Sequence, residues 1–144
     1  MKIVVQRSKA SSVKVGDSVV GSIKNGLVLL VCFEKDDTEI VLDKSIEKIL
    51  ALRIFPDENL KMNKNIIESS GEVLAISQFT LSWNGKKGNR PSFDNSMAPD
   101  MAEKLFIEFC ERLKQSVTVE TGAFGELMEV SITNDGPVTF HLDF

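Results

Sequence analysis

The sequence predicts a compact α+β domain in which layers of β-sheet are covered by two helices. Short apolar or alternating runs bounded by turn residues occupy the beginning and the end of the chain, as is typical of strands. Two segments between them carry apolar residues at helical spacing. With 144 residues, 42% of them hydrophobic, and no linker or repeat, we expect one domain that spans residues 1–144.

The first part of the chain is predicted to be a β-meander. The Gly16-Asp17 pair suits a tight hairpin turn, and Asn25-Gly26 tolerates positive φ at both central positions of a second turn. The run that follows Asn25 is continuously apolar, which predicts a central strand. The expected strands are residues 2–7, 13–15, 18–23 and 26–33.

Two helices are expected. Asp36-Asp37-Thr38 offers N-cap oxygens ahead of the first, at about residues 39–52. Its apolar positions are Leu42, Ile46, Ile49 and Leu50. Pro99 fits the first turn of the second helix. Its apolar stripe is Met101, Leu105, Phe109 and Leu113. Residues 60–70, between the helices, are predicted to form an irregular connection or a short hairpin.

The remaining strands follow from short apolar runs. Residues 72–76 come after Ser69-Ser70-Gly71 and predict a buried strand, and further strands are expected at 117–120 and 127–132. The last run, 138–144, alternates. Its apolar face is Val138, Phe140, Leu142 and Phe144. His141 points the other way, with Thr139 and Asp143, and a lone histidine there is expected to be a surface residue.

Composition limits the function classes. A net charge of −4 and a pI near 5.1 argue against a general nucleic-acid binder or a membrane-surface protein, although a local basic patch remains compatible. Cys32 and Cys110 are far apart and only His141 could join them, so we expect buried thiols, no metal site and no cofactor. No run approaches the roughly 20 apolar residues of a membrane helix or resembles a signal peptide. The expected location is the cytoplasm.

The stretch Ser77-Gln78-Phe79-Thr80-Leu81 ends the buried strand of residues 72–76 and changes abruptly in character. Two hydroxyls and an amide come to the edge of the core, with Phe79 between them as an apolar anchor. Taken alone, the stretch is also typical of a strand end whose polar side chains satisfy backbone groups.

The loop of residues 82–93 carries three positive charges and no negative one, in a chain that is acidic overall. Lys86, Lys87 and Arg90 are suited to neutralising phosphates, and two glycines allow close backbone approach to a ligand. A solvated loop with incidental lysines is the alternative.

The usual catalytic motifs are absent: the sequence has no HExxH, GxSxG, P-loop or dinucleotide fingerprint. Thr80 is a possible nucleophile, but no base lies near it in the sequence. The residues alone therefore leave three possibilities. The chain is a hydrolase that positions its substrate and stabilises an oxyanion through backbone N–H groups, a threonine-nucleophile esterase using Thr80, or a non-enzymatic RNA-binding module.

Residues 77–81 together with Asn134-Asp135-Gly136-Pro137-Val138-Thr139 resemble the paired signature of the D-aminoacyl-tRNA deacylases, chiral proofreaders that cleave D-amino acids from tRNA. The resemblance extends over essentially the whole chain. The further segments that carry it are Val4–Arg7, Leu52–Phe55, Lys61–Asn63, Lys87–Phe93 and Thr121–Gly125 leading to Met128. Val31–Glu34 and Ser82–Gly85 depart from the family's pattern.

This resemblance implies two antiparallel β-sheets, sandwich- or barrel-like, with two helices alongside, in a homodimer with its active sites at the interface. It implies hydrolysis of D-aminoacyl-tRNA, and of glycyl-tRNA because glycine has no side chain to exclude, without a cofactor. It also implies that Gly136-Pro137 is cis and enters the partner's pocket, held there by Arg7 and Met128.

The candidate residues fall into three groups, of which the resemblance implies the first two and the charge of the loop supplies the third. The catalytic group is Ser77, Gln78, Phe79, Thr80, Gly136 and Pro137. The substrate-binding group is Arg7, Phe124, Met128 and Asn134. The tRNA-binding group is Lys86, Lys87 and Arg90.

Overall fold

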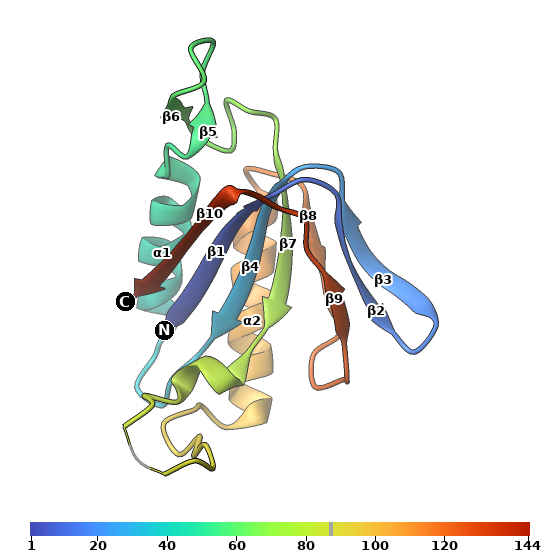
Figure 1. Ribbon diagram of the computed structural model, residues 1–144. Helices are drawn as coiled ribbons and strands as arrows, with labels where there is room; N and C mark the ends of the chain where they lie inside the picture. The colour runs from blue at the N-terminus through green and yellow to red at the C-terminus, as the bar shows by residue number, and fades with distance from the viewer. Residues whose placement is uncertain (87) are drawn as a thin grey trace.

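The structure is a computed structural model that describes residues 1–86 and 88–144 (Figure 1). The strands are β1 (Lys2–Ser8), β2 (Ser11–Val15), β3 (Ser18–Ile23), β4 (Gly26–Cys32), β5 (Phe55–Pro56), β6 (Met62–Lys64), β7 (Glu72–Ser77), β8 (Val119–Thr121), β9 (Glu129–Ser131) and β10 (Asn134–Asp143). The helices are α1 (Glu39–Ala51), the short 3₁₀ helix η1 (Phe79–Ser82) and α2 (Pro99–Lys114). The predicted α+β class with two long helices is confirmed.

The main sheet has five strands in the order β10-β1-β4-β7-β8. It is mixed, and not antiparallel throughout as the resemblance implied. The pairs β10–β1 and β1–β4 are antiparallel, but β4–β7 and β7–β8 are parallel. The connections between the parallel strands pass through α1 and α2, and parallel neighbours require such crossovers. A three-stranded sheet, β3-β2-β9, and the small pair β5-β6 complete the fold.

The expected meander is instead one long, bent hairpin. β1 pairs with β4 from Lys2↔Cys32 to Ser8↔Gly26, and β2 pairs with β3 from Ser11↔Ile23 onward in the same register. β1 and β2 therefore form one arm, and β3 and β4 form the other. The arms leave the main sheet together and join β9 in the smaller sheet (Figure 1).

The two turn predictions for this hairpin have different outcomes. The turn at Gly16-Asp17 is confirmed as the hairpin tip, between the pair Val15↔Ser18. The turn at Asn25-Gly26 is wrong, because there the chain bends between two strands of one arm. Gly26 has φ +142°, and a Cβ on it would lie 1.9 Å from the carbonyl oxygen of Glu72. Gly26 is needed because its lack of a Cβ lets β7 approach closely, and not because the chain reverses there.

Both helices cover one face of the main sheet, and the β3-β2-β9 sheet covers part of the other. On α2 the buried residues are Phe106, Phe109, Cys110 and Leu113. The predicted apolar stripe was wrong at Met101, which is 52% exposed. Met101 precedes Phe106 by five residues, and this offset along the helix directs its side chain well away from the buried side of α2. β7 has helices on one side and the smaller sheet on the other, so residues 73–76 are all buried, as predicted.

The carboxyl ends of β4 and β7 meet at one edge of the sheet, where the chain continues into residues 33–38 and into η1.

His141 is exposed on β10, as predicted. Among the described residues, neither long helix combines the length and the apolar character needed to cross a membrane.

Candidate active site

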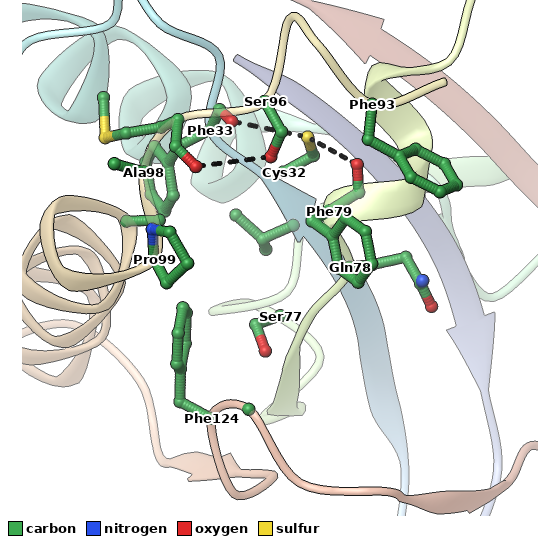
Figure 2. A pocket seen from close by; sticks show the side chains of 14 residues that line it. Cys32, Phe33, Ser77, Gln78, Phe79, Phe93, Ser96, Ala98, Pro99 and Phe124 are labelled. Carbon is green, nitrogen blue, oxygen red and sulfur yellow. Dashed lines mark hydrogen bonds between the residues drawn. The ribbon is translucent and has the colours of Figure 1, made fainter. Parts of the chain in front are cut away.

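A pocket of about 450 Å³ opens at the carboxyl ends of β4 and β7, between η1 and the start of α2 (Figure 2). Its lining is mostly apolar: Val31, Phe33, Phe79, Phe93, Met97, Ala98, Pro99, Ala102 and Phe124. Polar groups come from Ser77, Gln78 and Ser96. The pocket therefore suits a flat apolar group held beside a few hydrogen-bonding positions.

The first signature stretch forms one side of this pocket. β7 ends at Ser77, and the N–H of Gln78 still donates to the carbonyl oxygen of Val31, at 2.7 Å. The amide Nε2 of Gln78 donates to Oγ1 of Thr80, at 2.5 Å. Phe79 is not the buried anchor that we predicted: it is 56% exposed, and its ring meets Phe93 edge-on with centroids 4.9 Å apart.

Two backbone donors at the start of η1 are available. Among the described residues, the N–H groups of Phe79 and Thr80 donate no hydrogen bond, as is usual for the first positions of a helical turn. Phe79 lines the pocket together with Ser77 and Gln78, and Thr80 is the next residue in the chain. A developing negative charge on a substrate oxygen could be stabilised there.

Cys32 lies beneath this stretch, with its Sγ 3.5 Å from the carbonyl oxygen of Phe79. Burial, and then the nearby carboxylate of Glu34, raises the pKa of this thiol to about 11. Burial likewise raises the pKa of Cys110 to about 12. Both cysteines are buried free thiols, as predicted, and both stay neutral at pH 7. In the part of the chain that the structure describes, no three His, Cys, Asp or Glu side chains gather as a metal site.

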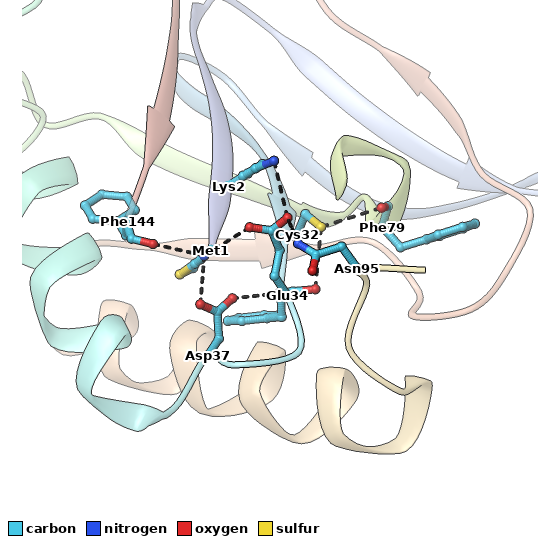
Figure 3. Close-up of polar contacts among 9 residues, drawn as sticks. Met1, Lys2, Cys32, Glu34, Asp37, Phe79, Asn95 and Phe144 are labelled. Atoms are coloured by element: carbon cyan, nitrogen blue, oxygen red, sulfur yellow. Dashed lines mark hydrogen bonds and ion pairs between the residues drawn. The ribbon is translucent and has the colours of Figure 1, made fainter. Parts of the chain in front are cut away.

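The pocket wall at residues 93–98 is fixed to the end of β4 through Glu34 (Figure 3). Oε1 of Glu34 accepts from Asn95 Nδ2 at 2.5 Å and pairs with Lys2 Nζ at 3.2 Å. The N–H of Glu34 donates to Asp37, which also accepts from the Met1 ammonium group. No sequence motif distinguishes Glu34 from the neighbouring charged residues, so its role was not predicted.

The second signature stretch lies at the start of β10. The Gly136-Pro137 peptide bond is cis, as predicted. Arg7 braces it from β1: Nη1 donates to the carbonyl oxygen of Ile54 at 2.6 Å, and Nε lies 3.0 Å from Oδ2 of Asp135 in an ion pair. Gly136 has φ +119°, and a Cβ on it would lie 3.2 Å from Nη2 of Arg7.

Asn134 forms hydrogen bonds on both sides of this turn. Its Nδ2 donates to the carbonyl oxygens of Arg7 (3.0 Å) and Val138 (3.1 Å). Its Oδ1 accepts from Nε2 of Gln6 (3.2 Å) and Oγ1 of Thr139 (2.9 Å). Two donors and two acceptor positions are the full capacity of an amide, so all of it is used within the chain.

Within one chain, the two signature stretches lie far apart. Ser77 pairs with Val31, Val31 with Ile3, and Ile3 with Leu142. Three strand spacings separate Ser77 from Leu142, and five more residues of β10 lead back to Pro137. At about 4.8 Å per strand and about 3.3 Å per residue, the separation is roughly 20 Å. Figure 1 shows the start of β10 and the end of β7 at opposite ends of the sheet.

The other predicted residues are distributed as follows. Phe124 lines the pocket and its ring lies 6.1 Å from that of Phe106. Met128 packs instead on the opposite face of the sheet, over Gly122. Lys86 and Arg90 are exposed. Lys87 lies outside the described residues.

The chain is similar to known proteins over its whole length. The family described as D-Tyr-tRNA(Tyr) deacylase matches residues 4–143. A D-aminoacyl-tRNA deacylase of Persephonella marina is 52% identical, with 99% of this chain and 97% of the relative covered, and one of Bacillus cytotoxicus is 52% identical, with 96% of each covered.

Two solved structures are also similar. One titled c-Myc DNA Unwinding Element Binding Protein has a TM-score of 0.95 at 38% identity, over 100% of this chain and 99% of its own. A probable eukaryotic D-amino acid tRNA deacylase shares the fold, with a TM-score of 0.86 at 18% identity over 99% and 98% of the two chains. The chain belongs to the D-Tyr-tRNA(Tyr) deacylase family.

Proposed function

We propose that this chain hydrolyses the ester bond between a D-amino acid and tRNA, and that it also accepts glycyl-tRNA. The observation that carries the proposal is the pocket lined by Ser77, Gln78 and Phe79, at the start of a helical turn where the N–H groups of Phe79 and Thr80 donate no hydrogen bond among the described residues. Family membership supports the same reaction and disfavours both an RNA-binding module without activity and a threonine-nucleophile esterase. Aminoacyl-tRNA is used in translation, so we propose that the protein acts in the cytoplasm.

A deacylation assay with matched D- and L-aminoacyl-tRNA tests this function. We expect release of the D-amino acid, sparing of the L form, and full activity in the presence of a chelator. Equal cleavage of both forms would contradict the chiral selectivity. Activity lost with the chelator and restored by zinc would contradict metal-free catalysis.

The ester sits on the 3′-terminal nucleoside of tRNA, and the pocket is suited to its flat base. Phe124, Phe93 and Pro99 line it with apolar surface, and the ester would then lie at the polar rim near Ser77. The N–H groups of Phe79 and Thr80 would stabilise the oxyanion. The neighbouring ribose hydroxyl of the tRNA would assist the attacking water.

Thr80 is expected to position Gln78 and not to act as a nucleophile. Its hydroxyl accepts the Gln78 amide at 2.5 Å, and among the described residues no basic side chain hydrogen-bonds to it. Thr80→Val keeps the shape but removes this acceptor, so we expect kcat/KM to fall about 10-fold without loss of the reaction. Thr80→Ser is the control and should remain near wild type. An acyl-Thr80 adduct detected by mass spectrometry would refute the assignment.

We further propose a homodimer in which Gly136-Pro137 of one subunit completes the pocket of the other. The separation of roughly 20 Å between the signature stretches supports this, because one chain cannot bring both to one substrate. Rigid carbonyl groups of Gly136 and Pro137 could exclude an L side chain of any shape, whereas an apolar pocket discriminates by only about 1–3 kcal/mol per methylene. Met128 of one subunit would then contact the cis turn of the other subunit.

Lys86 and Arg90 are proposed to contact phosphates near the acceptor end, with Lys87 as a third candidate. We expect Lys86→Ala with Arg90→Ala to raise KM for tRNA substrates and to reduce the slope of log K against log salt by about 1.4–1.8. The matched control is Lys44→Ala with Lys48→Ala, two exposed lysines on α1. An unchanged slope in the loop variant would indicate a solvated loop without phosphate contacts.

A further inference from the structure

A second pocket, also of about 450 Å³, lies next to the first. The segment of residues 92–96 contributes to both: Phe93 and Ser96 line the first pocket, and Ser92, Asp94 and Asn95 line the second. On its other side the second pocket is lined by Ser82, Trp83, Asn84 and Lys86. Groups bound in the two pockets would therefore be immediate neighbours.

Ser82 indicates that this pocket takes a polar ligand. Its side chain is 5% exposed, and its Oγ has no hydrogen-bond partner among the described residues. Leaving a buried hydroxyl without a partner is unfavourable, and such groups in native proteins call for an explanation. Rotation of the Ser82 side chain toward the pocket would let a ligand that accepts or donates a hydrogen bond supply the missing partner.

Trp83 indicates that the ligand is flat. Trp83 lines the pocket and is 37% exposed, so part of its indole surface is open to a ligand there. Aromatic side chains of this kind stack on the bases of single-stranded nucleic acid. Lys86 supplies a positive charge at the same pocket, and Asp94 supplies a carboxylate that would repel a phosphate but accept from an amino group.

We propose that this second pocket binds the nucleotide that precedes the esterified 3′-terminal nucleoside, with its base stacked on Trp83. This inference rests on the proposed function. In tRNA that nucleotide is a cytidine, whose N4 amino group is the donor that Asp and Glu side chains recognise. Asp94 would accept from it, Ser82 Oγ would donate to the ring, and Lys86 would neutralise the linking phosphate. Because every mature tRNA ends in the same trinucleotide, the site serves all of them.

Fluorescence provides a test that is independent of activity, because Trp83 is the only tryptophan in the sequence. The probes are unacylated cytidylyl-adenosine, uridylyl-adenosine and adenosine, each titrated into the full chain. We expect quenching by cytidylyl-adenosine, weaker quenching by uridylyl-adenosine and none by adenosine. Equal quenching by adenosine, or none by the dinucleotide, would overturn the assignment.

Kinetics with truncated substrates provides the second test. For Trp83→Ala we expect kcat/KM on D-aminoacyl-tRNA to fall about 5- to 150-fold, the range for one base–aromatic stack, mainly through KM. Hydrolysis of the D-aminoacyl ester of adenosine alone should not change, and Trp83→Phe should restore most of the loss. Ser82→Ala should weaken the binding of tRNA substrates but not that of the nucleoside ester. Thermal stability should be unchanged, because the substitution removes a hydroxyl that has no hydrogen-bond partner.

The outcomes separate this inference from the proposed function. If Trp83→Ala affects the nucleoside ester and the tRNA equally, or affects neither, the second pocket is not the site of the preceding nucleotide. If the wild-type chain releases no D-amino acid from any substrate while cytidylyl-adenosine still quenches Trp83, the proposed function fails and the nucleotide site stands.

Discussion

Replacing Gly136 by alanine is expected to lower kcat/KM for D-aminoacyl-tRNA by about 100-fold or more, because misplacing a positioning group by about 1 Å has effects of this size. Gly136 has φ +119°, where L side chains are strained, and a Cβ would lie 2.7 Å from Val138 Cγ2 and 2.9 Å from the Val138 backbone nitrogen. The turn must therefore shift within its own chain, before any substrate is considered. Deacylation assays on the purified variant measure the effect.

Gly16→Ala is the matched control for this substitution. Gly16 also has positive φ, +56°, but a Cβ there would meet nothing within 4 Å. It lies at the tip of the bent hairpin, so its replacement adds backbone strain without moving the cis turn. We expect near wild-type activity from Gly16→Ala, and similar losses in both variants would indicate that strain alone explains the Gly136 result.

Mixed subunits then decide whether the turn acts in its own chain or in the partner's. A heterodimer of one Gly136→Ala chain and one Gln78→Ala chain should keep one working site, because the intact pocket of the first faces the intact turn of the second. With both changes on one chain opposite a wild-type chain, no site should work. The reverse pattern would show that the turn completes the pocket of its own subunit, and sedimentation of each mixture checks that dimers are present.

The elements with strong local patterns could be predicted from the sequence. The two long helices, the buried strand β7 and the hairpin tip at Gly16-Asp17 each depend on neighbours in sequence. The failures depend on contacts that are distant in sequence. Asn25-Gly26 has the composition of a turn, but the approach of Glu72 from β7 determines its conformation. Parallel pairing of β4, β7 and β8 likewise follows from helix crossovers that strand patterns alone do not specify.

The candidate site was predicted in part. Both signature stretches were identified, and the cis peptide bond was confirmed. The pocket wall held by Glu34 and Asn95 was not, because it joins residues 61 positions apart. The unpartnered hydroxyl of Ser82 was also missed, since a serine in a polar loop gives no sign in the sequence that it is buried.

Asn134 was predicted to bind substrate, but its hydrogen bonds favour a positioning role. Both of its N–H groups and both acceptor positions are used by Arg7, Val138, Gln6 and Thr139, so none is left for a ligand. Together these bonds close the turn that contains Gly136-Pro137 and join it to β1. If that turn is the chiral filter, Asn134 determines its orientation without touching the substrate.

Asn134→Asp is therefore expected to lower kcat/KM for D-aminoacyl-tRNA by about 100-fold and to raise the relative rate on the L form. The carboxylate cannot donate to the carbonyl oxygens of Arg7 and Val138, so two hydrogen bonds become repulsions. Thr139→Val removes only one donor to Oδ1 and should cost about 5-fold, while Thr139→Ser should cost nothing. The ratio of D to L rates is the decisive measurement, because a change in stability alone lowers both rates together. A 100-fold loss with an unchanged ratio would assign Asn134 to folding, and a rise in KM for D substrates alone would return it to substrate binding.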